Sequence, residues 1–271
     1  MFGSKPDLDL VRLRKSADLV GRTLAEVAKH IRPGVTTREL DTVADNFIRS
    51  NGARPAFKGY DPGWGGGAFA GACCMSVNEI VVHGIPSDRP LENGDLLTVD
   101  TGVELNGYFG DSAYTFAIGE ITDEQRRLLR VTYESLDLGV AQAVTGRRTG
   151  DIGHAIQQHC EAAGYGVVRE LVGHGIGRTL HGPPNVPNYG QRGVGRKLKE
   201  GMALCIEPMI SAGTYEIEHG PDKWAVLTAD RAPAAHYEHM VVVRGGKPDV
   251  LTTFAYVEAV IEAPYKEPVG A

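Results

Sequence analysis

Residues 97–111, LTVDTGVELNGYFGD, constrain the fold most strongly because they are typical of a β-hairpin. The dipeptide Asn106-Gly107 favours a two-residue type I′ turn, in which both central residues have positive φ. With this turn, Leu105 pairs with Tyr108. Each further pair lies one residue earlier on the first strand and one residue later on the second. The sequence therefore predicts the register of the whole hairpin.

The predicted register brings two aspartates onto one face of the sheet. Gly102 opposes Asp111 and Ala113 opposes Asp100, so the aspartates are diagonal neighbours with backbones roughly 7–8 Å apart. Gly102 predicts free volume opposite Asp111. A solvated face is the alternative, but Phe109 and Ala113 lie on the same face, which is therefore not uniformly polar. Two like charges there need a cation, and oxygen ligands suit one or two divalent metals.

Composition indicates an ordinary globular chain with local, specific partners. The 271 residues are 42% hydrophobic and 23% charged, which is enough for a sizeable core. The net charge of −6 and the scattered lysines and arginines disfavour binding to nucleic acid or to an anionic membrane. Apolar runs of membrane-spanning length are absent, and the first residues lack the apolar stretch of a signal peptide. We expect a cytoplasmic protein.

The four cysteines form no CxxC pair and no plausible disulfide framework. Cys160 and Cys205 are interpreted as small core residues. For the vicinal pair Cys73-Cys74, lining a pocket and plain burial remain open.

Apolar periodicity and capping residues predict the helices. A first helix runs from Leu8 to about Ile31, and capping boxes at Thr36 and Thr122 open two more. The third helix extends to about residue 143, and a fourth covers 149–163. A glycine-rich loop is expected at 63–71, and strands are expected at 80–82, 96–103, 108–118, 167–172, 202–206, 224–228 and 237–243.

The order helix, helix, strands occurs twice, over about 8–118 and 122–245. We therefore predict an α+β fold, in which two related halves share a largely antiparallel sheet covered by helices. Long linkers are absent, so residues 1–271 are expected to form a single catalytic domain.

Three further segments place ligand-type residues beside apolar strands. His174 follows a strand between glycines, Glu207 ends the strand in MALCIEPMI, and Glu238 precedes a run of valines. Each acid alone could be a strand-end surface residue. Together with the two aspartates, however, they make five potential ligands whose four carboxylates would balance two divalent cations. His83 and His181 are left for hydrogen bonding or proton transfer. The other histidines, His236 among them, are interpreted as ordinary satisfied side chains.

These motifs resemble type I methionine aminopeptidases, within the creatinase/prolidase group of the pita-bread fold. The resemblance extends from the first helix to about residue 245. The segments that carry it are SVNEIVVHGIP (76–86), VDTGVELNGYFGD (99–111), GHGIGRTLHGPPNVPNYG (173–190), CIEPMI (205–210) and YEH (237–239).

The resemblance implies a dinuclear site with cobalt, manganese, iron or zinc as the metal. Asp111 and Glu238 would bridge two divalent ions, and Glu207 would also serve as proton shuttle in the attack on the first peptide carbonyl. His83 and His181 would contact the substrate and the tetrahedral intermediate. The metal ligands implied are Asp100, Asp111, His174, Glu207 and Glu238. The implied pocket for the methionine side chain contains Cys74, His83, Leu180 and Trp224, with Tyr60 or Phe69 closing it.

The function implied is removal of the initiator methionine when a small residue follows. The expected partners are nascent polypeptides or peptides with a free N-terminal methionine, with transient contact with the ribosome, and the chain is expected to be a monomer. Two alternatives remain: an Xaa-Pro aminopeptidase or prolidase-like enzyme with the same ligands, and a non-catalytic binding protein of the same fold.

Overall fold

The structure is a computed structural model that describes residues 9–63, 65–263 and 265. Leu8 of the predicted first helix and Trp64 of the predicted glycine-rich loop lie outside the described residues. The helices are α1 (Leu10–Ala28), α2 (Thr37–Ser50), α3 (Asp123–Val140), α4 (Thr149–Ala162) and the short α5 (Ala255–Glu258).

Side-chain caps begin the first three helices. The side chain of Asp9 accepts a hydrogen bond from the backbone N–H of Arg12 at the start of α1. Both predicted capping boxes are present, with Thr36 opening α2 and Thr122 opening α3. Each box satisfies backbone N–H groups that the first helical turn leaves unpaired. Local sequence therefore sets where these helices begin.

The strands of the described residues form four antiparallel sheets. In the first sheet, β4 pairs with β5 along one edge and with β1 and β2 along the other, and a five-stranded sheet has the order β15-β14-β9-β7-β8. The two three-stranded sheets have the orders β13-β10-β6 and β11-β12-β3. The strands are β1 (Arg54–Pro55), β2 (Cys73–Val77), β3 (Ile80–Val82), β4 (Leu96–Leu105), β5 (Tyr108–Ala117), β6 (Gly166–Val167), β7 (Val172–Gly175), β8 (Gly182–Pro187), β9 (Ala203–Ile206), β10 (Met209–Ser211), β11 (Ile217–His219), β12 (Val226–Thr228), β13 (Ala234–His236), β14 (His239–Val242) and β15 (Asp249–Val250).

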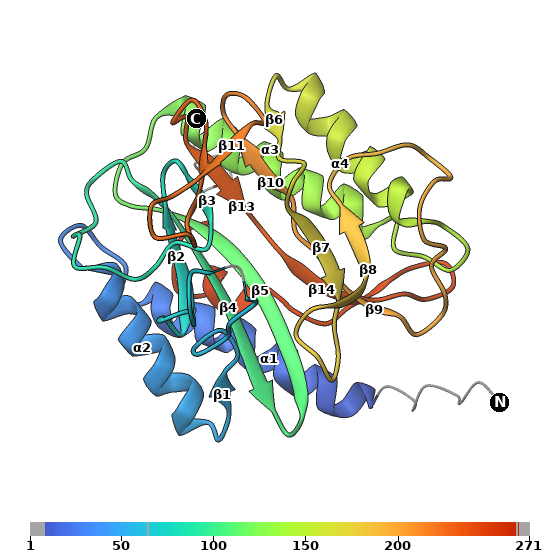
Figure 1. The fold of residues 1–271 in the computed structure, drawn as a ribbon, viewed down its shortest axis with the longest axis horizontal. Helices are drawn as coiled ribbons and strands as arrows, with labels where there is room; N and C mark the ends of the chain where they lie inside the picture. The colour runs from blue at the N-terminus through green and yellow to red at the C-terminus, as the bar shows by residue number, and fades with distance from the viewer. Residues whose placement is uncertain (1–8, 64, 264, 266–271) are drawn as a thin grey trace.

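Helices cover the strands in two pairs, as Figure 1 shows. Helix α1 packs on β5 and β4 with α2 beside it, while α3 and α4 pack together near the strands of the second half of the chain. The predicted α+β class with largely antiparallel strands and two helix–helix–strands segments is confirmed in these elements.

The single strand predicted over 167–172 is wrong. Val167 pairs with Ile210 in one sheet, whereas Val172 pairs with Pro187 in another. The chain crosses between the two sheets over residues 168–171, and apolar composition alone cannot reveal this crossing. Strands β2 and β13 were not predicted, because both are buried along their whole length and lack alternating polarity.

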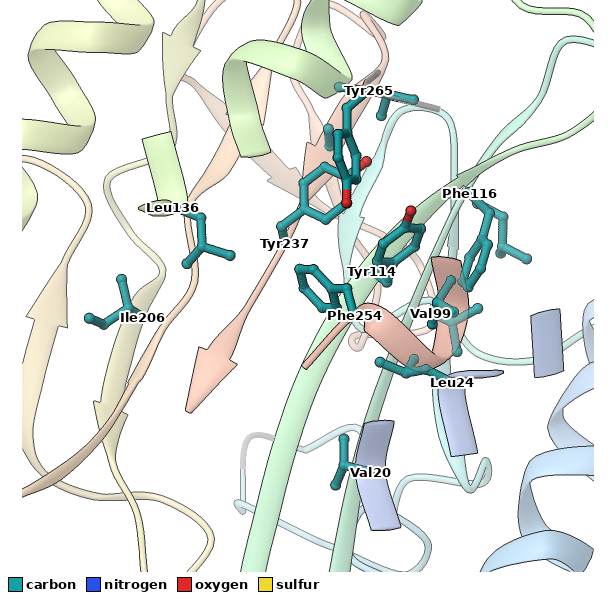
Figure 2. Close-up of a cluster of buried hydrophobic side chains, with 14 of the residues drawn as sticks. Val20, Leu24, Val99, Tyr114, Phe116, Leu136, Ile206, Tyr237, Phe254 and Tyr265 are labelled. Atoms are coloured by element: carbon teal, nitrogen blue, oxygen red, sulfur yellow. The ribbon is translucent and has the colours of Figure 1, made fainter. Parts of the chain in front are cut away.

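An aromatic cluster lies at the centre of the core. Figure 2 shows Tyr114 of β5 close to Tyr237 and Phe254, with ring centroids 5.2 and 4.9 Å from that of Tyr114. Val20 and Leu24 of α1 are buried in the same core. The core therefore joins the first helix and the hairpin to the C-terminal strands. Among the described residues, no helix combines the length and the apolar character needed to span a bilayer.

Candidate metal centre

The hairpin of β4 and β5 places Asp100 and Asp111 as the turn chemistry predicts. Asn106 and Gly107 have φ of 54° and 78°, and Leu105 pairs with Tyr108. The register continues without a bulge from this pair to the far end of the hairpin, with Asp100 opposite Ala113 and Asp111 opposite Gly102. Both aspartates line a cavity of about 360 Å³.

Three other predicted ligands come from distant parts of the chain. His174 lies within β7, Glu207 immediately follows β9, and Glu238 lies between β13 and β14. All three line the same cavity as the hairpin aspartates. The fold therefore brings the five predicted ligands together around one space.

His174 turns one ring nitrogen toward the acids. Its Nδ1 lies 3.1 Å from the carbonyl oxygen of Gly175, and because a carbonyl only accepts, Nδ1 carries the proton. Burial lowers the pKa of His174 to about 3, so the ring is neutral and Nε2 is a free acceptor. Nε2 lies 3.6 Å from Oε1 of Glu207 and 3.8 Å from Oδ2 of Asp111. Acceptors that face one another at such distances leave room for a cation.

Several carboxylate oxygens of this group are buried without a hydrogen-bond partner among the described residues: Oδ1 of Asp100, Oδ1 of Asp111 and Oε1 of Glu238. Burial raises the pKa of Asp100 to about 7. Burial and the neighbouring acids raise the pKa of Asp111, Glu207 and Glu238 well above the ordinary range. Buried carboxylates in such surroundings are costly unless they coordinate a metal. Oxygen ligands with one neutral imidazole suit a divalent ion, so the residues fit the implied metal.

Cys205 lies against the acids. Its Sγ and ligand atoms of Asp111, His174 and Glu238 all lie within 4.8 Å of one another. It is fully buried, as predicted for a core residue, although the sequence did not indicate that it borders the metal centre.

Apolar and aromatic side chains line the same cavity. The predicted residues Tyr60, Phe69, Cys74, His83 and Trp224 all line it. Lining a pocket is therefore the outcome for Cys74. Leu180 was also predicted to line the pocket, but it is not among the described residues that do so, and it is buried in one apolar cluster with Phe69 and Trp224. Eight lining residues were not predicted, and Phe57, Val82 and Met209 are among them. Met209 lies two positions after Glu207, a spacing that could have indicated it, because alternate side chains of an extended chain share a face.

The free volume predicted beside Gly102 is filled. A Cβ atom at Gly102 would lie 2.6 Å from Cε1 of Phe57 and 3.0 Å from Cβ of Ala56. Glycine is required here because the ring of Phe57 packs on the hairpin backbone next to the aspartates. Only tertiary packing reveals this contact.

Two predicted histidines border the cavity. His83 has a positive φ of 59°, which is uncommon outside glycine, and its ring meets that of Trp224 edge-on at 6.1 Å between centroids. Burial, with smaller contributions from neighbouring histidines, lowers the pKa of His83 to about 4, and burial also lowers the pKa of His181. Nδ1 of His181 is hydrogen-bonded to the hydroxyl of Tyr60 at 3.2 Å. Both rings are therefore neutral at neutral pH.

His236 differs from the prediction that it is an ordinary satisfied side chain. It is 1% exposed, and its Nε2 lies 3.7 Å from Oε2 of Glu207. Neither ring nitrogen has a hydrogen-bond partner among the described residues. No short motif in the sequence places this histidine beside the metal centre.

Comparisons with known proteins agree with this site. Residues 11–245 match the model of metallopeptidase family M24. The chain is 49% identical to a methionine aminopeptidase of Clostridium acetobutylicum, over 92% of this chain and 97% of that protein. It is 45% identical to methionine aminopeptidase 1 of Bacillus subtilis, over 93% of this chain and 99% of that protein.

Solved structures show the same fold. A crystal structure of methionine aminopeptidase from Rickettsia prowazekii superposes with a TM-score of 0.87 at 39% identity, covering 90% of this chain and 97% of that one. Prolidase from Pyrococcus furiosus has a TM-score of 0.73 at 22% identity, covering 90% of this chain and 64% of that one. The prolidase likeness concerns the fold alone.

Proposed function

The chain belongs to metallopeptidase family M24, and from that premise we propose that it removes N-terminal methionine from proteins and peptides whose second residue is small. The observation that carries this proposal is the cavity itself, which five ligand-type side chains and several aromatic and apolar side chains line together. Relatives at 49% and 45% identity named methionine aminopeptidase support the same substrate.

The acids and His174 would hold the metal. We propose two divalent ions, and Asp111 and Glu238 would help to hold both of them, because four carboxylates and a neutral imidazole balance two divalent charges. Cobalt, manganese, iron and zinc are the candidates, since oxygen-rich sites with one imidazole accept each of them. When bound, such metals polarise the scissile carbonyl and make water a better nucleophile.

The remaining residues would orient the substrate and move protons. The neutral rings of His83 and His181 can donate an N–H to the oxygen on which negative charge develops. Glu207 would accept a proton from the attacking water and pass it to the leaving amine. The free amine of the substrate would bind beside the carboxylates. The thioether side chain of its first residue would pack against Phe69, Cys74 and Trp224, which line the cavity.

We propose that residues 1–271 act as one catalytic domain and as a monomer. Nascent polypeptides with a free N-terminal methionine are the proposed substrates. This role would place the protein in the cytoplasm, in transient contact with ribosomes.

A peptide panel tests the proposed function. The purified protein, loaded separately with manganese, cobalt, iron or zinc, is incubated with Met-Ala-Ser, Met-Lys-Ser, Ala-Ala-Ser and Ala-Pro, and released amino acids are measured by chromatography. We expect methionine from Met-Ala-Ser alone, and no product in the presence of a chelator. Turnover restricted to Ala-Pro would show an Xaa-Pro peptidase instead, and metal binding without any turnover would show a binding protein.

A further inference from the structure

His236 is a buried imidazole for which the proposed mechanism has no role. Its side chain is 1% exposed, and both ring nitrogens lack a hydrogen-bond partner among the described residues. A buried donor or acceptor without a partner destabilises the folded state. Packing alone does not explain a histidine at position 236, because an apolar side chain would fill a buried space without leaving polar atoms unpaired.

The hydroxyl group of Thr115 is hydrogen-bonded to both the backbone N–H and the backbone carbonyl of His236. The N–H of His236 donates to Oγ1 of Thr115 at 2.9 Å, and the Thr115 hydroxyl donates to the carbonyl oxygen of His236 at 2.8 Å. His236 also ends β13, where it pairs with Met209 of β10, two residues after Glu207. These contacts tie His236 to the hairpin strand β5 and to the segment that carries Glu207.

The ring faces the side of the Glu207 carboxylate that His174 does not. Nε2 of His174 lies 3.6 Å from Oε1, and Nε2 of His236 lies 3.7 Å from Oε2. His174 carries its proton on Nδ1, so it can only accept through Nε2. Within the described part of the chain, His236 has no hydrogen bond on Nδ1 that would fix the proton there, so its Nε2 can carry the proton. The distance exceeds the upper limit of an ordinary N–H···O bond by only about 0.5 Å.

We propose that His236 is a positioning residue that donates its Nε2–H to Oε2 of Glu207 and thereby holds the other oxygen, Oε1, toward His174 and the metal. The inference rests on the proposed function, in which Glu207 binds metal and transfers a proton. Hydrogen bonds from such supporting residues fix the orientation of metal-binding carboxylates. His236 itself touches neither the metal nor the substrate in this assignment.

Three substitutions separate hydrogen bonding from packing. His236→Gln keeps an N–H donor on a side chain of similar reach, His236→Asn keeps the amide but is one methylene shorter, and His236→Leu removes the donor. The measurements are Mn²⁺ affinity by titration calorimetry, kcat and KM for Met-Ala-Ser, and thermal unfolding. We expect the Gln variant to resemble the wild type. The Asn and Leu variants should lose about 10–100-fold in Mn²⁺ affinity and in kcat, with KM little changed.

Several outcomes would overturn the inference. If the Asn and Leu variants bind Mn²⁺ and turn over as the wild type does, His236 has no positioning role. A Gln variant as damaged as the Leu variant would mean that the imidazole is itself a ligand or a packing element. Loss of thermal stability alone, with unchanged kcat per folded molecule, would show a purely structural role.

If the Leu variant does not fold, the comparison of the Gln variant with the Asn variant still tests the inference. Failure of the wild type to release methionine would refute the proposed function, whereas the Mn²⁺ affinities would still test His236.

Discussion

Asp111 is the residue on which the candidate metal centre depends most. It lies between Gly102 across the hairpin and His174 of a different sheet, and its Oδ1 has no hydrogen-bond partner in the described chain. Its side chain is almost fully buried at the lining of the cavity, so an uncompensated negative charge there is costly. The charge of Asp111, and not only its shape, is therefore expected to matter.

Substituting Asp111→Asn should remove metal binding and activity. The amide of asparagine carries no charge and binds a divalent ion more weakly than a carboxylate, so we expect the rate of methionine release to fall more than about 100-fold, which corresponds to about 2.7 kcal/mol of activation free energy. Metal content by atomic absorption and turnover of Met-Ala-Ser measure the effect. The matched control is Asp88→Asn, because Asp88 is exposed and pairs with Arg38 at the surface, away from the cavity lining. A fully active Asp111→Asn protein would refute the proposed bridging role.

At the scale of the element, the β4–β5 hairpin carries two ligands with a register set by its turn. The opposed pairs run without a shift over ten positions on each strand, from Leu96 with Ala117 to Leu105 with Tyr108. A slip of one residue would reverse the faces on which the side chains of one strand point. The positive φ of Asn106 and Gly107 therefore contributes to the geometry of the metal centre.

Gly107→Ala tests the turn separately from the cavity. The φ of 78° is unfavourable for alanine, whereas a Cβ atom at this position would meet no atom within 4 Å. We expect the free energy of unfolding in urea to fall by about 1–2 kcal/mol. Gly245→Ala is the control, because Gly245 also has open space around its Cβ position and does not have a positive φ. Equal stability of the two variants would show that the turn conformation contributes little.

At the scale of the whole molecule, folding encloses several acids that repel one another. Burial raises the pKa of Asp100 to about 7, against about 3.9 for an exposed aspartate. Without metal, the folded chain therefore retains protons that the unfolded chain has already released. These groups make the metal-free protein less stable as the pH rises from about 4 through about 7. Metal binding removes this penalty by displacing the protons.

The stabilisation by metal should consequently grow with pH. We expect the difference in melting temperature between Mn²⁺-loaded and chelator-treated protein to be larger at pH 8 than at pH 5.5, and Mn²⁺ affinity to increase by more than about tenfold. Differential scanning fluorimetry and calorimetry in buffers of different ionisation enthalpy measure both quantities. A constant difference across this range would mean that the carboxyl groups are already ionised without metal.

Sequence alone was sufficient where the determining interactions are local. The capping boxes at Thr36 and Thr122 predict where two helices begin, because the groups involved are three residues apart. Asn106-Gly107 predicts a register that matches every pair of the hairpin, because the pairing follows from one turn conformation. The five ligand-type residues could be named as candidates because acids and histidine beside apolar strands are unusual.

Only the tertiary structure decided what surrounds those residues. Phe57 fills the space beside Gly102. His236 faces Glu207, although 29 positions separate them in the sequence. The chain also crosses from one sheet to another over residues 168–171, which the sequence did not predict. Periodicity and turn chemistry report interactions within a few residues, whereas these contacts arise from the packing of segments whose separation leaves no pattern in the sequence. The sequence thus determined the hairpin and its two aspartates, and packing decided that His174, Glu207 and Glu238 would meet them.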